Sequence, residues 1–227
     1  MIKTIVEIFY PRICPGCNTV LATAEKHICT KCIFHLPRTG YWKEKDNPIA
    51  RMLWGRVYLE NAAAYLHFQK KGRIQNIIHQ IKYKNQKELG LEIGKMFGKE
   101  LKGSNFALTD LIIPLPLHAS RLRKRGYNQS EIIAKGLSEA MNIPIINNAV
   151  IRSIGNTSQT RKGRYERWEN VENIFNVTKP ELLIDKHVLL VDDVLTTGAT
   201  IEACATAILK VPKTRVSIAT LAYSAKS

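Results

Sequence analysis

Two adjacent acidic residues, Asp192 and Asp193, follow a short apolar run in the C-terminal part of the chain. The run, Val188 to Val191, is continuous, as in a strand that is buried on both faces of a parallel sheet. Ligands of open α/β sheets bind outside the carboxyl ends of such strands. The position of the acidic pair therefore predicts a binding site at the end of this strand.

A cluster of hydroxyl side chains and a glycine follows the acidic pair, ahead of a helix that we predict over residues 201–210. The cluster consists of Thr196, Thr197, Gly198, Ala199 and Thr200. Closely spaced donors at a helix N-terminus favour a phosphate group. Because two carboxylates would repel a phosphate, we predict that they contact sugar hydroxyls or a metal ion. The alternative is that no ligand binds here, and that the two acidic residues simply end a strand before an ordinary threonine-rich helix cap.

Four of the five cysteines form two Cys-x-x-Cys pairs, namely Cys14 with Cys17 and Cys29 with Cys32. Two such turns place four thiolates at the corners of a tetrahedron, as in a structural zinc site. A redox-active motif and a disulfide framework are the alternatives, but the first predicts a single pair and the second requires an oxidising compartment. Four thiolates leave no open position on the ion, so the sequence predicts zinc that stabilises the fold without taking part in catalysis.

The middle of the chain is strongly basic, because residues 119–168 contribute +7 to the formal net charge of +15. An apolar strand that we predict over residues 110–117 is followed by four basic side chains, Arg121, Arg123, Lys124 and Arg125. Like charges this close repel unless an anion binds or the groups extend into solvent. In a transferase, a loop carrying Arg121, Lys124 and Arg125 could stabilise a departing pyrophosphate.

A second basic segment, residues 152–167, is polar, contains glycine and lacks the pattern of a buried strand. Its length and composition suit a mobile lid, which would exclude water from a reactive centre. The candidate lid residues are Arg152, Gln159, Arg161 and Arg167. A basic surface that is simply solvated is the alternative interpretation.

Length and composition limit the class of protein. The chain has 227 residues, of which 45% are hydrophobic and 23% are charged, a mixture typical of a globular protein and not of a disordered or fibrous one. No apolar run approaches the roughly 20 residues of a membrane helix, and the first residues are a poor secretory signal. We therefore expect a cytoplasmic protein without a membrane span, associated with membranes only through partners. The positive charge favours polyanionic partners such as phosphates, nucleic acid or anionic lipid.

These motifs divide the chain into a zinc module over residues 1–40, a connecting segment over 41–60 and a larger domain over 61–227. An alternating pattern predicts a strand over residues 61–68. We further predict helices, which cover residues 73–81, 89–101 and 130–141. Trp42 and Trp54 in the connecting segment are expected to pack against the fold.

The ten residues VDDVLTTGAT, from Val191 to Thr200, resemble the phosphoribosyl-pyrophosphate (PRPP) motif of type I phosphoribosyltransferases. The resemblance implies that Asp192 and Asp193 contact the 2′ and 3′ hydroxyls of the ribose. It also implies that residues 196–200 hold the 5′-phosphate. Neither implication identifies the acceptor of the phosphoribosyl group.

The order of the motifs along the chain resembles the ComF family of bacterial competence proteins. The resemblance rests on the two cysteine pairs, on PLPLHASRLRKRGYNQ at residues 114–129, on the polar lid segment and on VDDVLTTGAT, and it extends from Cys14 to about Tyr223. It implies a zinc ribbon joined to a type I phosphoribosyltransferase fold, with a mainly parallel sheet and flanking helices, and a link to DNA uptake during natural transformation. Lys162 departs from the family pattern, in which this position is often apolar.

Two functional hypotheses follow. In the first, the protein is a phosphoribosyltransferase: PRPP binds with Mg²⁺ at residues 192–200, pyrophosphate leaves towards residues 121–125, and an unidentified nucleophile attacks the ribose, with His118 as a candidate base. In the second, the protein is a non-catalytic adaptor that senses PRPP or a nucleotide and binds single-stranded DNA or a helicase-like partner. The acidic pair favours the first hypothesis, because DNA binding alone would not require it.

Overall fold

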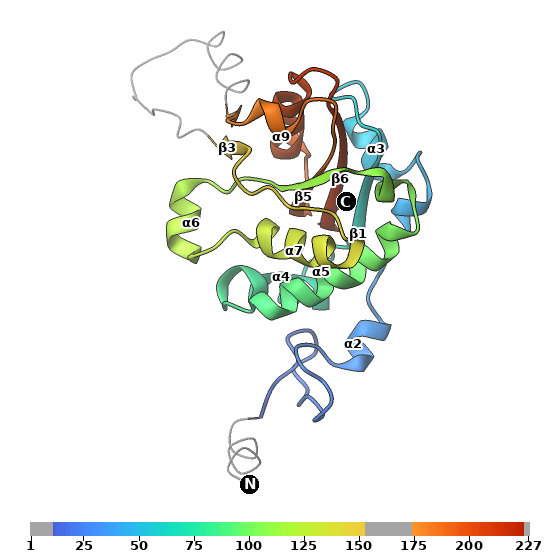
Figure 1. Cartoon of the computed structure of the whole chain (residues 1–227). Helices are drawn as coiled ribbons and strands as arrows, with labels where there is room; N and C mark the ends of the chain where they lie inside the picture. Colours follow the sequence, from blue (N-terminus) through green and yellow to red (C-terminus); the bar gives the residue numbers. More distant parts are fainter. Residues whose placement is uncertain (1–10, 153–173, 225–227) are drawn as a thin grey trace, which may run out of the picture.

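The computed structural model describes residues 11–152 and 174–224 (Figure 1). Its centre is a four-stranded sheet in the order β1-β6-β5-β2, in which every neighbouring pair is parallel. The strands are β1 (Ala62–His67), β2 (Leu111–Pro114), β5 (His187–Leu195) and β6 (Arg215–Tyr223). Almost all of their residues are buried, which explains the continuous apolar runs in the sequence. The structure confirms the predicted α/β fold with a parallel sheet.

Helices cover both faces of the sheet, and each face has its own apolar core. Figure 1 shows α4, α5 and α7 on one side of the sheet and α9 and α3 on the other. These helices are α3 (Pro48–Leu53), α4 (Arg73–Tyr83), α5 (Lys87–Lys102), α7 (Gln129–Met141) and α9 (Ala199–Leu209). The helices predicted over 73–81, 89–101, 130–141 and 201–210 are therefore confirmed, with small differences at their ends.

Helices α5 and α7 are in direct backbone contact because glycines line their interface. A Cβ atom on Gly94 of α5 would lie 2.5 Å from the carbonyl oxygen of Ile133. A Cβ atom on Gly136 of α7 would lie 2.4 Å from the carbonyl oxygen of Leu91. No side chain fits at these distances, so the contact fixes the position of α7 and of Ser130 in its first turn.

We expect Gly136→Ala to destabilise the fold by about 2–3 kcal/mol, because the added methyl group must separate two backbones. Thermal unfolding followed by circular dichroism measures the change. Gly103→Ala at the end of α5 is the matched control, since the nearest heavy atom to a Cβ there is 3.8 Å away. Equal stability of the two variants would contradict the packing argument.

The cysteine-containing module packs against α4 (Figure 1). It includes the short helix α2 (Thr30–Phe34) and an antiparallel bridge between Ile13 and Val20. Its buried side chains share one apolar core with four isoleucines of α4, Ile74, Ile77, Ile78 and Ile81. The chain that leaves the module then pairs with the outer edge of β1 through backbone hydrogen bonds. The module and the larger domain are thus joined by an extensive interface.

The connecting segment, residues 41–60, contains η1 (Tyr41–Lys43) and α3. Asn47 is buried and caps α3, because its side-chain oxygen accepts hydrogen bonds from the first backbone N–H groups of the helix. Trp42 is buried in the core, as predicted. The prediction was wrong for Trp54, which is 78% exposed. It lies one residue beyond the end of α3, whose buried position at that end is filled by Leu53.

The remaining elements are short: η2 (Asn105–Leu108), α6 (Ala119–Arg125), β3 (Val150–Arg152), β4 (Phe175–Val177) and η3 (Pro180–Leu182). Strands β3 and β4 form a separate antiparallel pair. Arg121, Lys124 and Arg125, which we predicted on a loop, lie in the helix α6. His118 caps this helix and Gly126, with a φ of +79°, ends it. In the two described ranges, no helix is both long enough and apolar enough to cross a membrane.

Candidate functional site

The acidic pair lies near the carboxyl end of β5. Asp192 Oδ1 accepts hydrogen bonds from the Ser130 hydroxyl at 2.9 Å and from the backbone N–H of Asp193 at 2.8 Å. Asp193 is only 6% exposed, and its Oδ1 lies 3.0 Å from Nζ of Lys82 in α4. Its Oδ2 is buried and has no hydrogen-bond partner among the described residues. Side chains of α7 and α4 thus contact the acidic pair, and Asp193 Oδ2 is available to accept a further hydrogen bond.

The surroundings of the acidic pair disfavour full ionisation. Burial raises the pKa of Asp192 above its ordinary value, and the adjacent charge of Asp193 raises it further. The hydrogen bonds to Asp192 and the charge of Lys82 act in the opposite direction. Hydroxyl donors or a cation from a ligand would therefore stabilise the ionised pair.

The hydroxyl cluster forms the turn between β5 and α9. Gly198 has a φ of +78°, a left-handed conformation that favours glycine, and it is the N-cap of α9. A Cβ atom there would also lie 2.9 Å from the Leu53 side chain of α3. Thr196, Thr197 and Thr200 are exposed at the N-terminus of this eleven-residue helix. An anion is favoured at such a position.

Arg56 holds this turn from the connecting segment. Its guanidinium donates to the carbonyl oxygen of Thr197 at 3.1 Å and forms an ion pair with Glu202 in the first turn of α9. Sequence reasoning assigned no role to Arg56. It lies 141 positions before Thr197, so no local pattern could have indicated the contact.

A cavity of about 460 Å³ lies beside the acidic pair. It is lined by predicted site residues from β5, the turn before α9, the first turn of α9, α6 and β3, namely Asp192, Asp193, Thr196, Thr200, Arg121, Arg125 and Arg152. Further lining residues come from α4 and α7, among them Lys82 and Ser130. The predicted residues Thr197, Gly198, Ala199 and Lys124 do not line the cavity. The cavity is therefore formed by segments that are far apart in the sequence.

Two arginines of α6 that are one helical turn apart both face the cavity. Arg121 and Arg125 are four residues apart and so share one side of the helix, and both line the cavity, whereas Lys124 does not line it. Arg125 donates hydrogen bonds to Gln129 Oε1 at 2.6 Å and to the Tyr83 hydroxyl at 3.2 Å. These contacts fix its guanidinium at the wall of the cavity.

Arg152 adds a third guanidinium from the end of β3, where it lies 5.4 Å from the ring centroid of Phe175. Burial lowers the pKa of Arg152, and the nearby charge of Arg121 lowers it further. Mutual repulsion of this kind is relieved when an anion binds between the groups. The predicted lid residues Gln159, Arg161 and Arg167 lie outside the described residues.

His118, the candidate base, is not part of the cavity lining. Its Nδ1 lies 2.7 Å from the Ser120 hydroxyl and accepts the Ser120 backbone N–H at the start of α6. The described contacts of His118 are therefore those of a helix cap.

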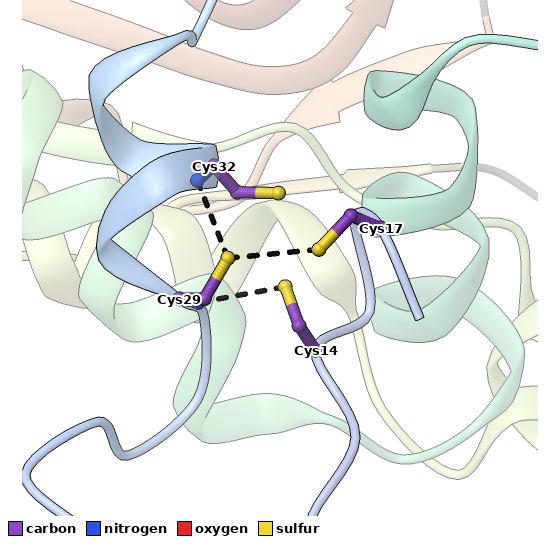
Figure 2. A group of neighbouring side chains, drawn as sticks. All are labelled: Cys14, Cys17, Cys29 and Cys32. Carbon is purple, nitrogen blue, oxygen red and sulfur yellow. Dashed lines mark hydrogen bonds between the residues drawn. The ribbon is translucent and has the colours of Figure 1, made fainter. Parts of the chain in front are cut away.

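The four predicted cysteines form a second candidate site, shown in Figure 2. Their sulfur atoms all lie within 4.8 Å of one another, and Cys17 Sγ is 3.6 Å from Cys29 Sγ. Four sulfurs around a tetrahedral zinc ion are about 3.8 Å apart. Backbone N–H groups donate to Cys14 Sγ and Cys29 Sγ, as is favourable for thiolates. The cluster could hold a metal ion.

The surroundings of the cysteines fit a cation. A Cβ atom on Gly16 would lie 2.9 Å from Cys32 Sγ, so glycine is needed for the first turn to approach the second. Hydrogen bonds with Thr19 lower the pKa of Cys17 to about 6, whereas burial raises the pKa values of Cys29 and Cys32. Buried thiols that resist ionisation become thiolates when a metal ion replaces their protons.

Comparison with known proteins shows what this chain is similar to. Residues 124–227 match the family model described as phosphoribosyl transferase domain. The chain is 27% identical over 207 residues to the DNA utilization protein YhgH of Shigella flexneri, covering 87% of this chain and 84% of that protein. It is 30% identical over 131 residues to competence protein F of Haemophilus influenzae, covering 55% and 57%. It is 26% identical over 205 residues to competence protein ComFC of Bacillus subtilis, covering 88% and 78%.

The matched domain contains the acidic pair and the turn before α9. The cysteine cluster lies ahead of it in the chain, in the order that the motifs predict. Residues 124–227 of this chain thus match a phosphoribosyl transferase domain, and most of the chain is similar to proteins named for competence and DNA utilization.

Proposed function

We propose that this protein binds PRPP with Mg²⁺ in the cavity beside Asp192 and Asp193 and acts as a phosphoribosyltransferase-type protein in DNA uptake. One observation carries the proposal: the acidic pair, the hydroxyl turn and three arginines line a single cavity. The match to a phosphoribosyl transferase domain supports the ligand class. The names of the relatives, which refer to competence and DNA utilization, support the biological process.

The chemistry of PRPP suits the distribution of charge around the cavity. The 5′-phosphate would bind at the turn over residues 196–200, and the ribose hydroxyls would donate to Asp192 and Asp193. The pyrophosphate would lie towards Arg121, Arg125 and Arg152. A volume of about 460 Å³ is typical of cavities that hold small molecules.

Residues of this chain would assist transfer of the phosphoribosyl group in two ways. The arginines would stabilise negative charge as it develops on the departing pyrophosphate. The lid predicted over residues 152–167, with Arg152 at its start, would exclude water from the ribose while an acceptor attacks. Lys124 lies on α6, is exposed and does not line the cavity, so it contributes to this proposal only through its charge.

The cysteine cluster is proposed to hold one structural Zn²⁺. Four sulfur ligands without an open position suit zinc better than Mg²⁺ or Ca²⁺, which prefer oxygen. When bound, the ion crosslinks the two turns of the module that packs on α4. The larger domain, over residues 61–227, would carry the chemistry.

Single-stranded DNA and a helicase-like competence protein are proposed as macromolecular partners of this protein in the cytoplasm. Arg123 and Lys124 are exposed on α6 and do not line the cavity. Positive charge thus remains available for a nucleic acid when the cavity is filled. Such contacts would weaken steeply with salt, because they release counterions.

Thermal unfolding tests whether PRPP binds. At PRPP concentrations 100-fold above the Kd, the free energy of unfolding should rise by about 2.7 kcal/mol, which raises the Tm by roughly 5–10 °C for a chain of this size. The measurement is made with Mg²⁺ present, and Mg²⁺ alone, pyrophosphate and ATP serve as controls. An unchanged Tm at millimolar PRPP would refute the proposal.

A further inference from the structure

Lys82 differs from an ordinary surface lysine in its surroundings. Its side chain is only 19% exposed, and Nζ lies 3.0 Å from Oδ1 of Asp193, whose side chain is 8% exposed. The contact joins the last turn of α4 to β5, which are far apart in the sequence. Lysine side chains are seldom buried to this extent unless they pair with an opposite charge.

The position of Lys82 on α4 explains why it reaches the acidic pair. The residues of α4 that line the cavity follow the spacing of one side of a helix, namely Gln75, Ile78, His79, Lys82 and Tyr83. The residues packed in the core against the cysteine module include Ile74, Ile77 and Ile81. The helix therefore has one face towards the cavity and one towards the module, and Lys82 belongs to the cavity face.

The charge of Lys82 matters because the proposed ligand is a polyanion. Two adjacent carboxylates would repel PRPP as it enters the cavity. Among the described residues, Lys82 is the cation that forms an ion pair with this acidic pair. Asp193 Oδ2 is buried, and no residue in the described part of the chain donates a hydrogen bond to it, so a ligand hydroxyl would supply the missing donor.

We propose that Lys82 is a positioning residue of the PRPP site, which holds Asp193 ready for a ribose hydroxyl and offsets the negative charge that would otherwise repel the ligand. The inference rests on the proposed function. Because Lys82 supplies part of the positive charge that PRPP needs, less Mg²⁺ is required for binding. No motif of the sequence marks this lysine.

The test compares Lys82→Gln, Lys82→Arg and the matched control Lys84→Gln, which removes an exposed charge just beyond α4. Glutamine can still donate to Asp193 but carries no charge, so this variant is less disruptive than an apolar replacement. Calorimetric titration gives the Kd for PRPP at a series of Mg²⁺ concentrations. Circular dichroism confirms that each variant is folded.

We expect Lys82→Gln to weaken PRPP binding by about 10- to 100-fold at low Mg²⁺, the effect of losing one charge-assisted contact. The difference should shrink as Mg²⁺ rises. Lys82→Arg should bind within about threefold of wild type, and Lys84→Gln should match wild type. Partial compensation by Mg²⁺ and rescue by arginine would not arise from a merely structural role.

Three results would overturn the inference. Lys82→Gln with the Kd and Mg²⁺ dependence of wild type would show that the charge has no role. Tighter binding by Lys82→Gln would show that the lysine blocks the site, and equal weakening at every Mg²⁺ concentration without rescue by arginine would show a structural effect. Wild-type protein that binds no PRPP would instead refute the proposed function, and the role of Lys82 with it.

Discussion

Replacement of both Asp192 and Asp193 by asparagine is expected to raise the Kd for PRPP at least about 100-fold and to abolish the PRPP-induced rise in Tm. Both carboxylates lie at the cavity, and each would accept a hydrogen bond from a ribose hydroxyl. Hydrogen bonds to charged groups contribute about 1.5–3 kcal/mol each, so the loss of two has a large effect. Calorimetric titration with PRPP and Mg²⁺ measures the change.

Substitution of Asp192 should affect the stability of the unliganded protein in a different way from its effect on PRPP binding. Burial and the charge of Asp193 raise the pKa of Asp192 to about 7 in the folded state, so the contribution of Asp192 to stability is fully present at low pH and is lost as the pH rises through about 7. At pH 8, Asp192→Asn alone should therefore be at least as stable as wild type while binding PRPP more weakly.

Asp46→Asn provides the matched control for these variants, since Asp46 pairs with Arg51 on the surface away from the cavity. The control should keep the PRPP response of wild type. If the double variant binds PRPP as tightly as Asp46→Asn, the ligand does not use the acidic pair.

Loss of the proposed metal ligand Cys32 should have an equally large effect, this time on folding. We expect Cys32→Ser protein to lose its zinc and the folded structure of the cysteine module. Structural zinc contributes about 10–16 kcal/mol of apparent binding free energy in small zinc domains, comparable with the whole stability of a typical domain. Elemental analysis of purified protein and thermal unfolding with and without a chelator provide the measurements.

Cys204→Ala is the control for this experiment, because Cys204 is buried in α9 and lies outside the metal cluster. It should retain about one zinc ion per chain and remain folded. Wild-type protein without zinc, or Cys32→Ser protein with the zinc content and Tm of wild type, would contradict the assignment.

Local patterns predicted those features that depend on neighbouring residues in the sequence. The apolar run before Asp192 predicted a buried parallel strand, and the spacing of the four cysteines predicted their cluster. Apolar residues spaced by three and four predicted α4, since its core face repeats with the period of a helix. These signals identified the fold and the position of the candidate site.

Contacts between distant segments could not be predicted in this way. Lys82 and Arg56 resemble ordinary basic residues in the sequence, yet one pairs with Asp193 and the other holds the turn before α9. Trp54 illustrates the opposite error, because its large apolar side chain suggested burial that the end of α3 does not provide. Each outcome depends on tertiary packing that a local pattern does not encode.

The two faces of α4 have a thermodynamic consequence. Helix α4 borders both the cysteine-containing module, through Ile77, and the cavity, through Lys82. Any coupling free energy that α4 transmits between the two sites must be reciprocal: a metal ion that increases affinity for the phosphoribosyl ligand is itself bound more tightly, by the same factor, when that ligand is present. Occupancy of the site by ligand would then protect the protein when zinc is scarce, and zinc supply would set how much of the protein can respond to its ligand.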